Sequence, residues 1–141
     1  DSNNLNDVEI LLIKREFNEL KNKIERAYIV FEYDSVEDII ELFIQNLGYK
    51  NDFHTNKSRN QVNYVIPRQR AMTICRYLFP LLSLEEIGKS FGGKDHATIL
   101  HSIKTVKNRY ETDKTYKNEF DNMQRYFFGS VEIDFNKLIK C

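Results

Sequence analysis

The chain has 141 residues, of which 41% are hydrophobic and 13% aromatic, a composition that indicates a folded core and excludes a disordered segment. Two cysteines are too few for a disulfide framework or a zinc-ligand spacing, and the sequence shows neither a membrane span nor a signal peptide, so we expect a cytoplasmic protein without metal or cofactor. The net charge is zero, yet residues 57–128 hold 13 Lys and Arg against 7 Asp and Glu, which suggests a polyanionic partner or simply an uneven surface charge.

A long amphipathic helix is predicted near the N-terminus. Its apolar residues alternate at intervals of three and four: Ile10, Ile13, Phe17, Leu20, Ile24, Ala27 and Phe31. This spacing is typical of a helix that packs against another helix. The partner is either a second chain, through self-association or a partner helix, or the rest of the same chain. We expect the helix to fold back on its own domain, because two Phe and one Ala make the seam irregular for a zipper.

Only five Gly and two Pro occur, so helices should dominate the fold. Asp34 or Ser35 begins a second helix, which ends at Gly48. Its apolar stripe consists of Val36, Ile39, Ile40, Phe43 and Leu47. The polar stretch 49–66 is predicted to be a long, partly mobile loop, of the kind that often carries function.

A third helix should open at Pro67 and end at Pro80. Its core residues are predicted to be Ala71, Ile74, Cys75 and Leu78, and its outward residues Arg68, Arg70 and Arg76. Ser83 begins a short helix, and Gly92-Gly93 forms a sharp turn. Asp95 then begins a longer helix with an apolar face of Ile99, Ile103, Val106 and Tyr110.

The final helix follows Asp113 and ends at Gly129. Its inward residues should be Tyr116, Phe120, Met123 and Phe127. After it, residues 131–135 alternate between apolar and acidic, which predicts a short strand or an extended arm. The fold class is therefore all-α, organised as an N-terminal helix (1–33), a helical domain (34–128) and a C-terminal tail (129–141).

A short helix, a glycine turn and a longer helix together describe a helix-turn-helix. In that motif the second helix enters the major groove of DNA, and its first residues reach base edges. Here those residues are Lys94, Asp95, His96, Ala97 and Thr98. Taken singly, Asp95 is more simply a helix cap and His96 a solvated side chain. The combination of five varied groups after a double glycine favours base recognition.

Several runs resemble the C-terminal DNA-binding domain of the bacterial replication initiator DnaA. They are Pro67-Arg68-Gln69, Ala71-Met72, the segment 83–88 and the segment 91–101. The resemblance covers roughly residues 34–126. It implies a Trp repressor-like helix-turn-helix bundle that binds short asymmetric sites on double-stranded DNA, with a link to replication initiation or its regulation.

The resemblance also implies a role for individual residues. The family's base-reading stretch corresponds to Asp95, His96, Ala97 and Thr98, its minor-groove arginine to Arg59, and its phosphate-contacting pair to Arg68 and Gln69. The chain departs from the family where Ala97 replaces Thr and where Lys94 replaces Arg, and the loop from Arg59 to Pro67 is longer than usual. The preferred site is therefore expected to differ from the standard DnaA box.

Catalytic chemistry is not predicted. Gly88-Lys89-Ser90 resembles the end of a phosphate-binding loop, but Ser83 stands where that motif requires Gly. The three histidines and Cys75 lack metal-ligand spacing, and no nucleophile–base pair is evident. Two other classes stay open: the DNA-targeting tail of a larger enzyme such as a transposase, and an interaction protein that keeps the fold without binding DNA.

Overall fold

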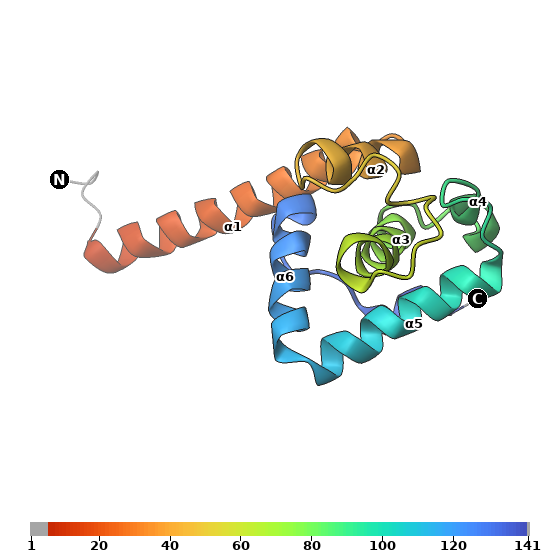
Figure 1. The fold of residues 1–141 in the computed structure, drawn as a ribbon. Coiled ribbons are helices and arrows are strands. Elements are labelled where there is room, and N and C mark those ends of the chain that lie inside the picture. Colours follow the sequence, from red (N-terminus) through yellow and green to blue (C-terminus); the bar gives the residue numbers. More distant parts are fainter. Residues whose placement is uncertain (1–5, 141) are drawn as a thin grey trace.

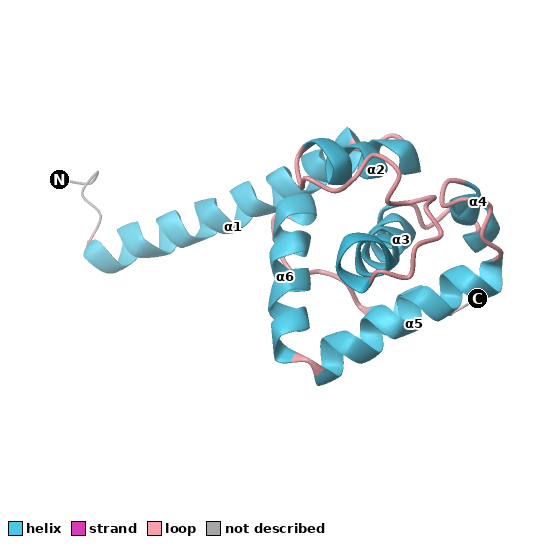
Figure 2. Ribbon diagram, viewed as in Figure 1, coloured by secondary structure: helices cyan, strands magenta, loops and turns pink. Residues whose placement is uncertain are grey.

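The computed structural model describes residues 6–140, except for the side chains of residues 25–32, and every regular element in that range is helical (Figure 2). The α-helices are α1 (Asp7–Glu32), α2 (Val36–Gln45), α3 (Ile66–Leu78), α4 (Leu84–Lys89), α5 (His96–Thr112), α6 (Lys114–Phe128) and α7 (Phe135–Leu138). A π-helical turn, η1 (Gln61–Val65), directly precedes α3. The all-α prediction is confirmed.

Helix α3 is the centre of the body, and α2, α4, α5 and α6 surround it (Figure 1). It contacts α2, α4, α5, α7 and η1. The core is rich in aromatic rings: Phe43 stacks on Phe53 at 5.4 Å and on Phe127 at 5.5 Å between ring centroids. These three side chains are fully buried and come from three separate segments, so their packing closes the body.

The helix ends follow local sequence rules, as predicted. Ser35 and Ser83 each form a capping box with an acidic residue three positions later, Asp38 and Glu86. Asp113 caps α6 by accepting from the Tyr116 amide at 3.1 Å. Gly129 ends α6 with a φ of 77°, a left-handed conformation that only glycine adopts without strain.

The stretch 49–66 is more ordered than the predicted mobile loop. Phe53 is fully buried against Phe43, so this polar stretch sends one aromatic ring into the core. Asn60 then caps η1 by accepting from the Asn63 amide at 2.9 Å. Composition alone suggested a loop because the buried ring is a single residue among polar neighbours.

Arg70 was expected on the outer face of α3, and that prediction is wrong. Its side chain is buried, with 4% of the residue exposed, and its guanidinium lies 4.2 Å from the Tyr116 ring centroid. The guanidinium also donates to Glu119 Oε2 at 3.1 Å. Arg76 is only partly exposed and donates to the carbonyls of Leu82 and Leu138.

The C-terminal tail forms no strand within the described residues. Residues 131–134 run without regular structure, and Phe135 and Leu138 of α7 then enter the core. Gln124 is fully buried and holds this segment. Its side-chain oxygen Oε1 accepts from the backbone amides of Glu132 and Ile133, each at 2.9 Å. The tail therefore packs on the helical body rather than forming a separate arm.

Helix α1 projects away from the body (Figure 1). The seam residues from Ile10 to Ile24 are exposed, so the expectation that this helix folds back is wrong for the described side chains. Ala27 and Phe31 lie outside the residues whose side chains the structure describes. Beyond α1, Tyr33 donates to the Phe127 carbonyl at 3.2 Å and joins the helix to α6.

Candidate nucleic-acid interface

Gly88 joins α4 to the turn that precedes α5. Its carbonyl accepts from the amides of Phe91, Gly93 and Lys94 at 2.9–3.1 Å. A Cβ atom at position 88 would lie 1.9 Å from the Lys94 carbonyl oxygen, so the two segments meet where no side chain fits. Gly92 and Gly93 have φ values of 80° and 77°, which favour glycine. The glycines thus set the angle between the two helices of the predicted helix-turn-helix.

The N-terminus of α5 presents four exposed residues in succession: Asp95, His96, Ala97 and Thr98. Asp95 Oδ1 accepts from the Thr98 amide at 2.8 Å, and this hydrogen bond lowers the pKa of the carboxyl group. Asp95 is therefore a helix cap, as expected, and its exposed side chain also points outside the core. Ile99 follows and is fully buried, so it fixes which face of α5 turns outward.

The exposed face of α5 continues beyond the residues predicted from sequence. His101, Lys104 and Asn108 are exposed, and they follow Ala97 at intervals of three and four. The His101 side chain is exposed to solvent rather than packed in the core. Lys104 is not among the site residues predicted from sequence, although its spacing of seven residues from Ala97 places both on the same face of a helix.

Arg68 contacts the protein's own backbone. Its guanidinium donates to the carbonyl of Asn56 and, at 3.0 Å, to that of Ser58. Partial burial lowers the pKa of this guanidinium. The side chain thus holds the segment that leads into Arg59, whereas the resemblance implied a contact with phosphate.

Arg59 is exposed at a defined place between two anchored residues. On one side Arg68 holds Ser58, and on the other Asn60 caps η1. Gln61 of η1 accepts from Arg109 of α5 at 3.3 Å, which ties this segment to the longer helix of the motif. Lys57 is exposed in the same segment, so two cations lie within three residues.

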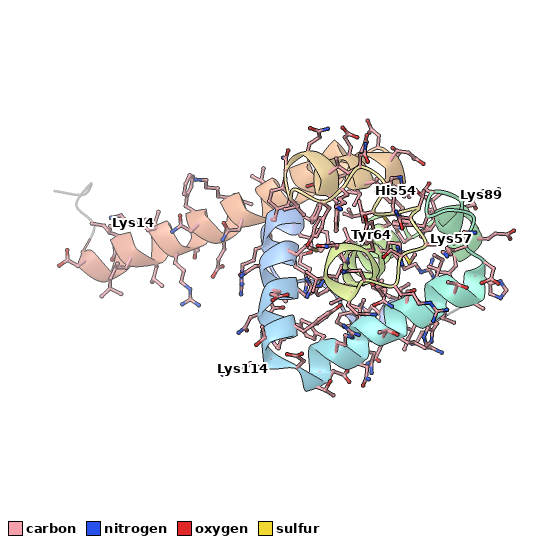
Figure 3. The ribbon with its side chains drawn as sticks, viewed as in Figure 1. Lys14, His54, Lys57, Tyr64, Lys89 and Lys114 are labelled. Carbon is pink, nitrogen blue, oxygen red and sulfur yellow. The ribbon has the colours of Figure 1, made fainter. Side chains whose placement is uncertain are left out.

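The segment that carries these cations lies against the glycine turn. A Cβ atom at Gly92 would come within 3.6 Å of the Thr55 Cα atom. Lys57 and Lys89 lie at the end of the molecule where α4 is found (Figure 3). Gln69 is partly buried in α3, and its side-chain oxygen is buried without a hydrogen-bond partner. Gln69 is therefore less available at the surface than the exposed residues at the start of α5.

The other candidates for chemistry in the described residues are a cysteine and the acidic and histidine side chains. Cys75 is fully buried, and burial raises the pKa of its thiol. Among residues 6–140, no three His, Cys, Asp or Glu side chains gather where they could hold a metal ion. None of the helices in that range combines the length and apolar character needed to cross a membrane.

Residues 36–106, about half of the chain, match the family described as bacterial dnaA protein helix-turn-helix. The chain is also similar to proteins named chromosomal replication initiator protein DnaA: 38% identical over 76 residues in Wolbachia sp. subsp. Brugia malayi, and 45% over 62 residues in Geotalea uraniireducens. These matches cover 54% and 44% of this chain but only 16% and 14% of the relatives, so the chain spans about a seventh of their length. No solved structure matches the chain significantly.

Proposed function

The chain belongs to the bacterial DnaA helix-turn-helix family, and we propose that it recognises a specific site on double-stranded DNA in replication initiation or its regulation. The observation that carries this proposal is the run of exposed side chains at the start of α5, next to a basic segment held in place. Within this proposal, residues 34–128 form the DNA-binding domain, residues 1–33 an added helix and residues 129–141 a tail.

The side chains divide into two roles. Asp95, His96, Ala97 and Thr98 are exposed at the N-terminus of α5, and side chains in that place of a helix-turn-helix reach base edges in the major groove. Lys94 stands directly before them and is partly exposed. The exposed Ala97 methyl fits a thymine methyl, and the Thr98 hydroxyl fits either a donor or an acceptor.

The basic side chains position the protein on the backbone. Arg59 and Lys57 lie in the segment next to the glycine turn, and Lys104 lies further along the exposed face of α5. We assign Arg59 to the minor groove and these lysines to phosphates. Arg68 acts through this segment by holding it. Gln69 stays a proposed contact with phosphate next to Arg68.

Selection of random duplexes by the full chain, followed by sequencing of the bound pool, tests whether a specific site exists. For the selected duplex, about 4 to 6 phosphate contacts predict that log affinity falls with log salt at a slope of about −4 to −5. A flat salt dependence, or a bound pool without a common sequence, would contradict the proposal. It would instead favour an interaction protein that keeps the fold without binding DNA.

His96→Ala separates base recognition from general affinity. If His96 contacts a base, the variant binds the selected duplex about 5- to 150-fold more weakly, whereas its affinity for random duplex changes little. Lys104→Ala is the matched change at a proposed phosphate contact on the same helix, and it should weaken both duplexes equally. Identical behaviour of the two variants on all sequences would contradict the division of roles.

A further inference from the structure

The projecting part of α1 carries an apolar seam that no described residue of this chain covers. Its side chains have exposed fractions from 37% to 65%, at Ile10, Ile13, Phe17, Leu20 and Ile24. A continuous apolar stripe of this length on a free-standing helix is an association surface. The spacing of three and four is that of positions a and d in a coiled coil, with Ile10, Phe17 and Ile24 at a.

The charges beside the seam identify the partner. With Ile10 at position a, the g positions are Glu9, Glu16 and Lys23, and the e positions among the described side chains are Lys14 and Lys21. In a parallel pair, each g residue faces the e residue five positions later on the other helix. Glu9 then faces Lys14 of a second copy, and Glu16 faces its Lys21. An antiparallel pair would place the basic e positions, Lys14 and Lys21, opposite one another and would not form the Glu9–Lys14 and Glu16–Lys21 pairs, so the pattern favours parallel self-association.

The shape of the seam agrees with this register. Phe17, Leu20, Lys21 and Ile24 line a hollow of about 270 Å³ on α1. They occupy positions a, d, e and the next a, which is a set of four that receives one side chain of a facing helix in knobs-into-holes packing. In a parallel, in-register pair, that side chain is Leu20 of the second copy.

From this seam, its flanking charges and its hollow, we propose that α1 pairs with α1 of a second copy in a parallel two-stranded coiled coil. The chain is then a homodimer in the absence of DNA, so this inference goes beyond the proposed function and does not depend on it. Tyr33 packs against Phe127 with ring centroids 6.0 Å apart and donates to its carbonyl, so the body is fixed to the end of α1. A parallel pair therefore places both bodies at the same end of the coil.

Sedimentation equilibrium of the full chain without DNA tests the proposal, and we expect a species of twice 16.8 kDa. Leu20→Asp should weaken association at least about 100-fold, because each helix loses a buried leucine and gains a buried charge. Leu11→Asp is the matched control, since Leu11 is 65% exposed and lies at position b, outside the seam. A monomeric or trimeric full chain, or greater sensitivity at Leu11 than at Leu20, would overturn the proposal.

Charge exchange tests the parallel register. Glu16→Lys and Lys21→Glu should each weaken association by about 3- to 10-fold, because each places like charges opposite one another. The double variant restores the opposite-charge pair between copies and should return the association constant close to that of the original chain. Glu19→Lys makes the same charge change at position c and should have little effect. Failure of the double variant to recover, with helix content unchanged by circular dichroism, would overturn the parallel arrangement.

Discussion

At the level of the single residue, Asp95 caps α5, and we propose that it also contacts a base; one substitution separates these two roles. Asp95→Asn keeps an oxygen that accepts from the Thr98 amide, so α5 stays capped and the unfolding midpoint should not change at neutral pH. The amide replaces a carboxylate that suits cytosine N4, so affinity for the selected duplex should fall about 5- to 150-fold. Fluorescence anisotropy with selected and scrambled duplexes measures this. Unchanged affinity would mean that Asp95 is a cap alone.

The same carboxyl group gives a pH dependence of defined sign. Because the cap hydrogen bond lowers the pKa of Asp95 in the folded state, the carboxylate stabilises the fold above its ordinary pKa. This contribution disappears as the pH falls through the lowered pKa of the folded protein. Asp95→Asn removes the titrating group, so the difference in unfolding midpoint between the two proteins should change only in acid.

Arg68 contacts backbone carbonyls of its own chain, whereas the family resemblance implies a contact with phosphate. Arg68→Ala removes the donors to the carbonyls of Asn56 and Ser58, so the free energy of unfolding should fall by about 1–3 kcal/mol in urea titration. DNA affinity should fall for all sequences, because the segment that presents Arg59 loses its anchor. Arg59→Ala is the matched control and should lower affinity without lowering stability. Weaker DNA binding by Arg68→Ala with unchanged unfolding would instead support a direct phosphate contact.

At the level of elements, the joint between α4 and α5 depends on one glycine. Gly88→Ala would place Cβ 1.9 Å from the Lys94 carbonyl oxygen, so the backbone must shift. We expect a loss of about 3 kcal/mol or more in the free energy of unfolding, measured in urea. Lys89→Ala, one residue later and exposed, should change the unfolding free energy by less than about 0.5 kcal/mol. Similar losses for both variants would contradict the role of this close approach.

The elements also show what the sequence can predict. The starts of α2, α4, α5 and α6 follow from Ser35, Ser83, Asp95 and Asp113, because a cap is decided by residues three positions apart. The apolar spacing of α5 predicts that Ile99 is buried, and the residues just before it, from Asp95 to Thr98, are exposed at the start of the helix. Local rules therefore place both the helices and most of the candidate interface.

Errors arose where a distant segment decides the environment. Arg70 is buried because Tyr116 and Glu119, more than 40 positions away in the chain, surround its guanidinium. Phe53 is buried because its ring stacks on Phe43 of α2, ten positions earlier in the chain. The position of α1 could not be read from its spacing, since the same seam fits the chain's own body or a second copy. In each case the deciding contact is absent from the local sequence pattern.

At the level of the whole molecule, charge is separated along the chain. Residues 57–128 have a surplus of positive charge, and the remaining residues have an equal surplus of negative charge. The proposed interface lies in the basic part, whereas α1 projects from the body (Figure 1). A polyanionic duplex is therefore attracted to the helix-turn-helix and its neighbouring segment, and self-association through α1 leaves these surfaces available.

The two proposals together predict which DNA the whole molecule prefers. A parallel coiled coil has a two-fold axis along its length, so the two bodies are related by that axis and fit two sites in inverted orientation. The full chain should bind a duplex with two inverted sites, about one helical turn apart or a multiple of this, about 100-fold or more tightly than a duplex with one site scrambled. Leu20→Asp should lose this gain while its affinity for a single site stays the same, as measured by anisotropy titration. An equal gain on directly repeated sites would show that the coil does not fix the orientation of the bodies, and a gain that survives Leu20→Asp would place the contact between copies outside α1.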